Sequence, residues 1–169
     1  MDNENNTTIK HEVRRIGGYL QKIVTIKNGS GKVIQTVMRP FMVELRPRDI
    51  LQIIIGATIL AIPVGLTEET WILGKELSLA KVAVLGVISV LFLSLFIYFN
   101  FYRYNIKGHV FNYIKRVLAT YFLSLLVVGT LLTLIDKCPW GVDNILAIKR
   151  IIITAFPASM AATLSDTIK

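Results

Sequence analysis

The chain has 169 residues, of which 53% are hydrophobic and 18% are charged, and its formal net charge is +8. The charged fraction lies below the roughly 25% of an ordinary soluble domain, which argues against that class. Nucleic-acid binding is not predicted either, because the lysines and arginines flank apolar segments instead of forming a basic face with aromatic support. That placement is typical of contact with anionic lipid headgroups.

The N-terminal part of the chain is polar and basic. Residues 1–18 are expected to form a mobile tail, and they lack the apolar core of a signal peptide. Within a basic region at 19–49, two β-branched segments (19–27 and 33–39) flank the polar turn NGSG, so a β-hairpin is predicted. A lone hairpin is marginally stable in water. We therefore expect this head to rest on the membrane surface, on a partner, or on the same hairpin of another subunit.

Four apolar runs follow the head, and about 20 such residues cross a bilayer as a helix. The fourth contains an uncharged stretch of only 15 residues, 151–165, and reaches spanning length if 145–148 join it. Lys149 and Arg150 would then extend toward the headgroups. A re-entrant or interfacial segment is the alternative. We place the spans at about 50–67, 82–102, 117–135 and 145–168, within a transmembrane domain at 50–169.

The predicted fold class is therefore an all-α polytopic membrane protein with four transmembrane helices and a small N-terminal cytoplasmic β-hairpin head. Its orientation follows from the basic residues, because cytoplasmic loops are enriched in them. One side of the predicted membrane holds fourteen Lys and Arg residues and the other holds five. This imbalance predicts a multi-pass protein of the cell membrane with both termini in the cytoplasm. Trp71 and Trp140 are expected to anchor the outer interface.

Two motifs resemble a known family. The first combines Pro63, Thr67-Glu68, Trp71 and Gly74, and the second combines Pro157-Ala158-Ser159 with Ser165-Asp166. With these motifs the chain resembles the prokaryotic integral-membrane family known as domain of unknown function 2391, over most of its length. The resemblance implies a membrane location and carries no activity.

Proline lies inside two of the predicted spans, at Pro63 and Pro157. Each removes a backbone donor and frees a carbonyl about one turn earlier. Broken helices of this kind build ion and substrate sites in transporters. The alternative is a simple kink, since proline is commoner in spanning helices than in soluble ones.

Charged residues gather at the predicted outer ends of the first and fourth spans. Glu68 and Glu69 lie at one, and Lys149 and Arg150 lie at the other. An ion pair between the two helices is one way to hold these charges near lipid. A cation-attracting ring of carboxylates from several subunits is a second, and solvated loop charge is a third.

Asp166 is expected at the inner end of the fourth span, near the depth of Arg103, Lys115 and Arg116. A structural salt bridge is one interpretation, and a proton or cation relay with neighbouring hydroxyls is the other. The small residues of 158–163 are read first as a helix contact surface. The candidate polar or ion site comprises Pro63, Thr67, Glu68, Glu69, Lys149, Arg150, Pro157, Ser159, Thr163, Ser165 and Asp166.

No catalytic residue, metal site or cofactor is predicted. His11 and His109 have no second histidine or cysteine at ligand spacing, and no hydrolase or metalloprotease motif occurs. Cys138 is expected to be an unpaired outer thiol.

Two function classes remain. The first is an oligomeric ion channel or small-solute transporter, expected as a homo-oligomer because four spans leave little room for a pathway within one chain. The second is a membrane-anchored interaction or regulatory module whose basic head binds lipid or a partner. An enzyme has no motif to support it.

Overall fold

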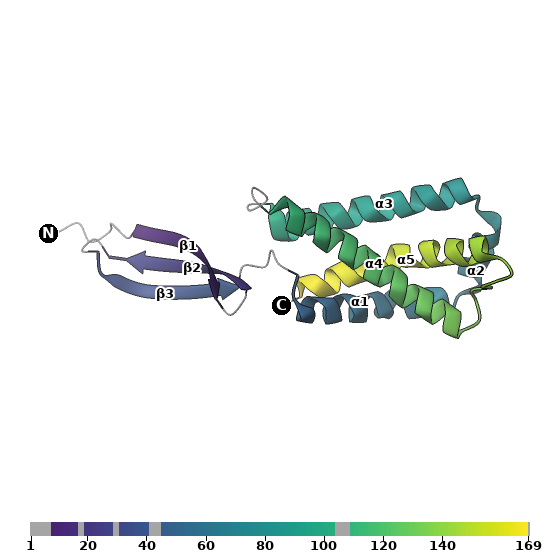
Figure 1. The fold of residues 1–169 in the computed structure, drawn as a ribbon, viewed down its shortest axis with the longest axis horizontal. Helices are drawn as coiled ribbons and strands as arrows, with labels where there is room; N and C mark the ends of the chain where they lie inside the picture. Colours follow the sequence, from purple (N-terminus) through teal and green to yellow (C-terminus); the bar gives the residue numbers. More distant parts are fainter. Residues whose placement is uncertain (1–7, 17–18, 29–30, 41–44, 104–108, 169) are drawn as a thin grey trace. The chain divides into compact units, whose positions relative to one another are not determined.

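The structure, a computed structural model, describes residues 8–16, 19–28, 31–40, 45–103 and 109–168. The chain divides into two units, residues 1–44 and residues 45–169. Figure 1 shows the first as a β-sheet and the second as a helical bundle.

The first unit is a three-stranded antiparallel sheet in the order β1-β2-β3. The predicted hairpin is present as β2 (Tyr19–Lys27) and β3 (Val33–Pro40). Between them Gly31 has φ 79°, a left-handed conformation that glycine adopts without steric cost.

A third strand, β1 (Thr8–Ile16), lies inside the expected polar tail and pairs with β2 along its whole length. Its mixed polar sequence, TIKHEVRRI, gives little strand signal, because strand formation depends strongly on the neighbouring strand.

The second unit contains four helices that are long and apolar enough to cross a membrane. The first is α1 (Pro47–Gly65), and the short α2 (Glu68–Glu76) follows it. α3 (Leu79–Ile97) continues into a π-helix, η1 (Tyr98–Tyr102). α4 (Val110–Leu134) and α5 (Asn144–Thr167) complete the bundle.

The four predicted spans correspond to these helices, with one large shift. α4 begins at Val110 instead of residue 117 and so includes Lys115 and Arg116. The expected fourth span at 145–168 is one continuous helix of 24 residues. α2 was not predicted as a separate helix.

Local sequence signals position the helix starts. Pro47 occupies the first helical turn of α1, where its missing N–H costs nothing. The Ser78 side chain accepts from the backbone N–H of Lys81 at the start of α3, and Asp143 Oδ1 accepts from the Leu146 N–H at 2.8 Å at the start of α5.

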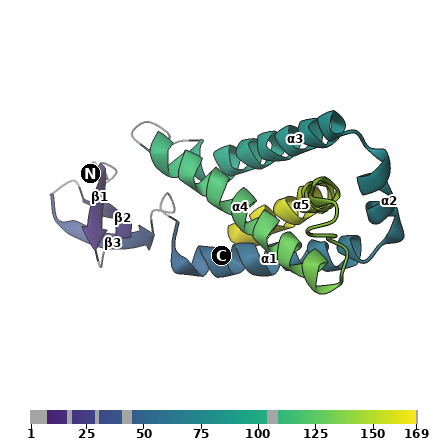
Figure 2. The ribbon, with the colours of Figure 1, turned by 45° about the vertical axis from the view of Figure 1, so that its right-hand side comes forward.

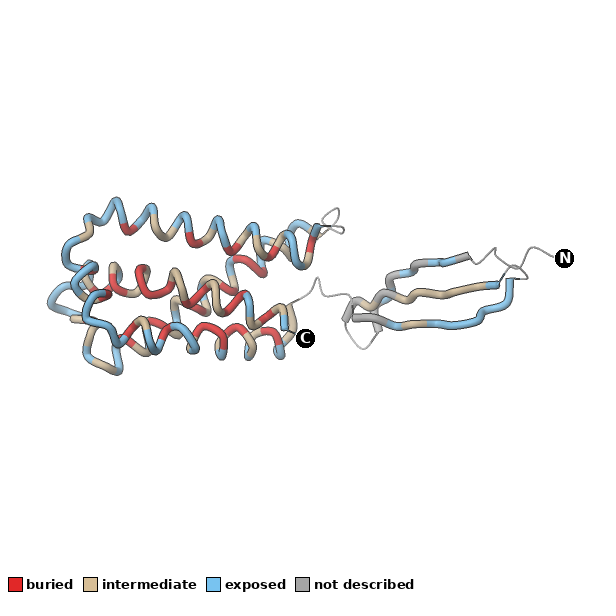
Figure 3. The backbone as a smooth tube through the Cα atoms, turned by 180° about the vertical axis from the view of Figure 1, so that it is seen from behind, coloured by how far each residue is buried: buried red, intermediate tan, exposed pale blue. Residues whose placement is uncertain are grey.

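α5 is the central helix of the bundle, with α1, α3 and α4 packed around it (Figure 2). In the most apolar segment of α5, 44% of the residues are buried, compared with 22% in the corresponding segment of the α3 span. α3 is therefore the peripheral helix. Buried positions face the interior of the bundle, whereas the outward faces are exposed (Figure 3). Those exposed faces are largely apolar, as lipid contact requires.

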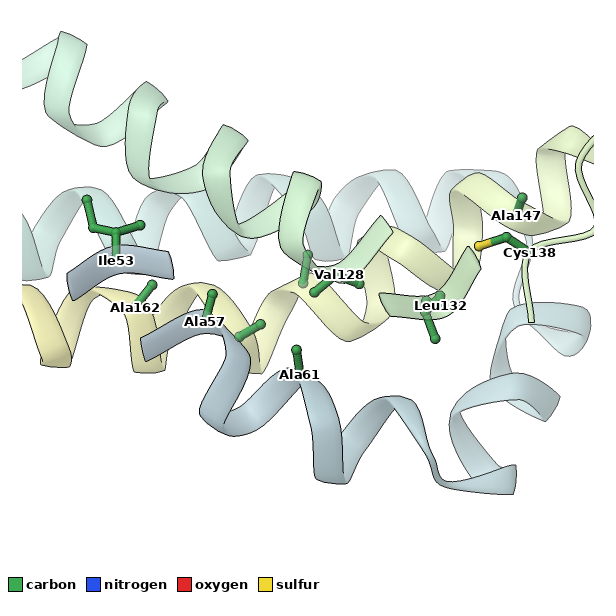
Figure 4. Packing of buried hydrophobic residues seen from close by; sticks show 10 residues of the cluster. Ile53, Ala57, Ala61, Val128, Leu132, Cys138, Ala147 and Ala162 are labelled. Carbon is green, nitrogen blue, oxygen red and sulfur yellow. The ribbon is translucent and has the colours of Figure 1, made fainter. Parts of the chain in front are cut away.

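Small residues allow α1 and α5 to approach closely (Figure 4). A Cβ atom at Gly56 would lie 2.5 Å from Ser165 Cβ and 2.7 Å from the Ala161 carbonyl oxygen. Ala57, Ala61, Ala158 and Ala162 are fully buried in the same core. The expected contact surface of 158–163 is thus the one that packs α5 against α1, as small residues do between membrane helices.

Candidate functional site

Two buried arginines mark the two ends of the helical unit. We call the end where α1 and α4 begin and where η1 and α5 finish the Arg116 end. The opposite end, where α2 and the connection 135–143 lie, is the Arg150 end.

At the Arg116 end, one arginine from α4 contacts carboxylates from two other helices. Arg116 donates to Asp166 Oδ2 from Nε at 2.9 Å and from Nη2 at 2.6 Å. The same Nη2 lies 3.3 Å from Asp49 Oδ2. All three side chains are at most 3% exposed. We call these three residues the charged cluster.

Asp49 has a second role in the cluster, because it also caps α1. Its Oδ2 accepts from the backbone N–H of Arg46 at 3.2 Å. A carboxylate in the first turn is favoured by the helix dipole. Asp166 sits in the last turn of α5, where the dipole disfavours negative charge. The Arg116 guanidinium offsets that penalty.

Aromatic residues of the π-helix enclose the cluster. The Arg116 guanidinium carbon lies 4.0 Å from the centre of the Phe101 ring, within the range of a cation–π contact. Tyr102 is fully buried beside Arg116 and packs edge-on against Tyr113 at 5.2 Å between ring centroids. All four long helices therefore contribute to this site, α3 through its π-helical extension.

Such a cluster is energetically demanding. Desolvating each charge costs several kcal/mol, and the interactions between charges repay this only with good geometry. Removing a single partner from a buried pair typically costs about 3–5 kcal/mol. The cluster thus ties α1, α4 and α5 together through buried charges.

At the Arg150 end, the buried arginine contacts backbone instead of carboxylates. Arg150 Nη1 donates to the Lys137 carbonyl at 2.6 Å, and Nη2 lies 3.4 Å from the Trp71 carbonyl. A Cβ at Gly74 would lie 2.6 Å from Arg150 Cγ, so glycine in α2 leaves room for the arginine stem. Arg150 thus fastens α2 and the 135–143 connection to α5.

The tryptophan of α2 completes this arrangement. The Trp71 indole donates to the Gly65 carbonyl at 2.8 Å, and the Lys137 ammonium lies 3.8 Å from the centre of its ring. Trp140 donates to the Thr133 hydroxyl at 2.9 Å.

The predicted outer ion pair between the first and fourth spans is not formed. Glu68 and Glu69 are exposed at the start of α2, and within the described residues neither carboxylate takes part in a salt bridge. Arg150 is occupied by the two carbonyls, and Lys149 is half-buried beside it. Residue numbers predict a common depth for these charges, but they do not predict toward which neighbour each side chain points.

The prolines do not break their helices. Pro63 lies two residues before the end of α1 at Gly65, whereas Pro157 lies well inside α5, which continues to Thr167. Of the two interpretations offered for these prolines, a break into two half-helices is therefore absent within α1 and within α5. Thr67 does not cap α2 with its side chain. Its hydroxyl donates to the Val64 carbonyl at 2.7 Å and lies 2.8 Å from the Thr70 hydroxyl.

The predicted inner residues of α5 divide into two groups. Asp166, Thr163 and Ser159 are buried and point into the bundle. Ser165 instead lies at the close contact with Gly56 of α1. The salt bridge expected for Asp166 is formed with Arg116.

Two members of the cluster, Asp49 and Arg116, were not among the predicted site residues. Both lie in charged stretches that flank apolar runs, and Arg116 was named only as one of three basic residues near the depth of Asp166. A usable signal was present in the capping pattern at Arg46-Pro47-Arg48-Asp49, which places a carboxylate in the first turn of α1.

Among the described residues, no group of three or more His, Cys, Asp and Glu side chains could hold a metal ion. Cys138 is free and 8% exposed in the connection before α5. Burial raises the pKa of its thiol.

Residues 27–167 match the family model described as "Putative integral membrane protein (DUF2391)". The chain belongs to this family. The match covers both motifs and all four long helices, so the protein is an integral membrane protein with four apolar helices. Comparison with curated proteins and with solved structures gives no match.

Proposed function

We propose that this member of the DUF2391 family moves a small ion or solute across the membrane, with the charged cluster as the part that changes state. The observation that carries the proposal is the buried Asp49–Arg116–Asp166 contact inside a bundle made of apolar helices. Ionisable groups inside membrane helices are rare and usually mark ion or proton pathways.

An anchor alone would not need this cluster. Apolar helices insert and remain inserted without buried charge. Replacing a buried ion pair by apolar residues of similar volume is often neutral or stabilising. The energetic cost of keeping two carboxylates and a guanidinium buried is therefore better explained by a role in transport than by anchoring.

The pathway is proposed to lie between subunits of a homo-oligomer in the cell membrane, with both termini in the cytoplasm. Two reasons support an oligomer. The core between α1 and α5 is closed by small residues in direct contact. The grooves along α4, of about 470 Å³ and 610 Å³, are lined almost wholly by apolar side chains, as lipid or helix contact requires and water does not.

In that assembly, Glu68 and Glu69 of several subunits would gather at the outer mouth. Their exposure in the monomer leaves both carboxylates available to attract cations.

The test is ion and solute flux into liposomes that contain the purified protein. We expect flux from the wild type and a strong loss in Asp166→Asn, which keeps the side-chain shape and removes the charge. The double variant Glu68→Gln, Glu69→Gln should lower cation flux and leave folding intact. Flux equal to that of protein-free liposomes under every gradient would overturn the proposal. A particle with the mass of a monomer in detergent would overturn the pathway between subunits.

A second candidate is a membrane-anchored module whose head binds anionic lipid. It is favoured by the head's separate fold and by exposed apolar residues on its strands, which are Ile9, Val33, Ile34 and Met38. Hydrogen exchange of the full chain in nanodiscs tests it. Protection of β3 that increases with anionic lipid content would support this candidate, and identical exchange in neutral and anionic bilayers would eliminate it.

A further inference from the structure

The buried arginine of the Arg150 end carries a charge that no carboxylate balances. Arg150 is 8% exposed, and within residues 45–103 and 109–168 it takes part in no salt bridge. Taking a charge out of water is costly, and a neutral carbonyl offsets less of that cost than an opposite charge does. Arg116, the other buried arginine, has carboxylates from two helices within 3.3 Å.

The two arginines differ in what the Nε–Nη2 edge of the guanidinium contacts. At Arg116, Nε and Nη2 both donate to Asp166 Oδ2, at 2.9 Å and 2.6 Å. At Arg150, Nε is buried and has no hydrogen-bond partner among the described residues. Its Nη2 lies 3.4 Å from the Trp71 carbonyl, beyond the usual N–H···O range of roughly 2.7–3.2 Å. Parallel N–H groups of this kind bind the oxygens of a carboxylate or a phosphate.

A second cation lies beside Arg150. The Lys137 ammonium lies 3.8 Å from the centre of the Trp71 ring, and the backbone carbonyls of Lys137 and Trp71 are the two that contact Arg150. No carboxylate lies within salt-bridge distance of Lys137 in the described parts of the helical unit. Two positive charges thus share the same pair of neighbouring residues, which favours an anion close to them.

The short helix α2 does not supply the missing negative charge. It packs against α5, and its buried residues are Thr70 and Gly74. A Cβ atom at Gly74 would lie 3.4 Å from Arg150 Nε, so α2 presents a glycine to this edge of the guanidinium. The carboxylates of α2 are all exposed, at Glu68, Glu69 and Glu76.

We infer that the Arg150 end binds a phosphate group, with the Nε–Nη2 edge of Arg150 and the Lys137 ammonium as its donors. Phosphate fits because its oxygens accept parallel bonds from a guanidinium and its charge balances the two cations. The site lies at the opposite end of the bundle from the charged cluster and does not depend on the proposed transport.

The depth of the site is compatible with a lipid headgroup. Arg150 lies six residues after Asn144, the first residue of α5, which is a rise of about 9 Å. Its bond to the Lys137 carbonyl, in the connection before α5, shows that the side chain extends back toward that end of the helix. Long cationic side chains reach headgroups in this way. Free inorganic phosphate offers the same oxygens, and the experiment distinguishes the two sources.

The test is thermal unfolding of the delipidated full chain in a nonionic detergent and a phosphate-free buffer. The probes are inorganic phosphate, a short-chain phosphatidylglycerol, and a diacylglycerol with the same acyl chains and no phosphate. A phosphate-bearing probe should raise the melting temperature of the wild type, because a ligand stabilises the state that binds it, and the diacylglycerol should not. A shift with phosphatidylglycerol alone identifies the headgroup as the source, and a shift with inorganic phosphate identifies the free anion.

Variants locate the site. Arg150→Met should lower the affinity for the active probe by roughly 10- to 100-fold, the range for lost hydrogen bonds to a charged group. Arg150→Lys keeps the charge and removes the edge, so it should bind almost as weakly. Lys137→Met, at a half-buried position, should lower the affinity by about tenfold. Lys75→Met, at an exposed position of α2, is the matched control and should bind as the wild type does.

Three results would each overturn the site. The first is a wild type whose melting temperature changes with neither phosphate-bearing probe, and the second is an equal shift with the diacylglycerol. The third is wild-type affinity in both Arg150→Lys and Lys137→Met. If the Arg150 variants do not elute as folded particles, Lys137→Met and Lys75→Met decide, because equal affinities in these two variants would overturn the site as well.

Discussion

The two ends of the bundle each bury one arginine, and they satisfy it in opposite ways. Arg116 contacts two carboxylates, from α1 and α5, within 3.3 Å. Arg150 donates to the carbonyls of Lys137 and Trp71. The first arrangement pairs buried charges from different helices, whereas the second depends only on backbone position.

This difference gives the two ends of the bundle different chemistry. Backbone carbonyls do not titrate, so the Arg150 end is a fixed clamp on α2 and on the connection before α5. The Arg116 end instead joins charges from three helices, so its stability depends on keeping each buried charge paired. The variants below would break or sharpen this contrast.

Arg116→Met should have the largest effect. It leaves two carboxylates buried without their guanidinium, and we expect a loss of about 3–5 kcal/mol in the free energy of unfolding. Thermal unfolding in detergent measures it. Lys115→Met, at the exposed neighbouring position, is the control and should change little. Adding Asp49→Asn and Asp166→Asn to Arg116→Met should restore part of the stability. A triple variant that is less stable than Arg116→Met alone would contradict the role of buried charge.

Arg150→Met should cost less, because neutral carbonyls are left behind instead of charges. Losing hydrogen bonds from a charged donor predicts a decrease of about 1.5–3 kcal/mol in unfolding free energy. Protease cleavage near α2 should also become faster. Lys149→Met is the matched control at the half-buried neighbour. Equal losses in both variants would show that the clamp is not specific to Arg150.

Gly56→Ala should separate α1 from α5 beside the charged cluster. Its Cβ would meet backbone and side-chain atoms of α5 within 2.8 Å, and overpacking of this kind costs about 1–3 kcal/mol. Gly129→Ala is the control, since its nearest neighbour, Ile151 Cδ1, lies at an ordinary 3.6 Å. Similar melting temperatures for the two variants would argue against the close α1–α5 contact.

Cys138 offers the smallest and most local effect, at the Arg150 end. Burial raises the pKa of its thiol, a shift that the Thr133 side chain and the positive charge of Arg150 partly offset. The folded chain should therefore react with iodoacetamide more slowly than the unfolded chain, and its reaction rate should rise at higher pH between about pH 7 and pH 10.

The sign of the linked stability follows from the same raised pKa. The unfolded thiol ionises first, so folding stability is fully present below its ordinary pKa and decreases as pH rises through the raised one. The chain contains a single cysteine, so the native and unfolded chains report on the same thiol. Equal rates of iodoacetamide reaction for the folded and unfolded chains at every pH would contradict the burial of Cys138.

The sequence predicted the four helices well, because long uncharged runs admit few other structures. It predicted the start of α4 poorly, since Lys115 and Arg116 were read as loop charges. Burial of Arg116 depends on carboxylates that are 67 and 50 residues away, a distance at which sequence spacing gives no information. β1 and α2 were missed for a related reason, because β1 depends on pairing with β2 and α2 packs against α5.

The candidate site was predicted only in part. Asp166, Ser159 and Thr163 were named from the α5 segment, and all three are buried. The charges of α2 and α5 lie at one end of the bundle, but the ion pair offered as one interpretation is not formed. Depth follows from residue number, whereas contact also requires the rotation of each helix about its axis.

The double role of Asp49 has a consequence for the order of events during synthesis. Its carboxylate both caps α1 and accepts from Arg116, which the ribosome adds 67 residues later. The contact between Asp49 and Arg116 can therefore form only after α4 has been made. Asp166 follows a further 50 residues after Arg116, so the three side chains of the cluster can meet only after α5 has been made.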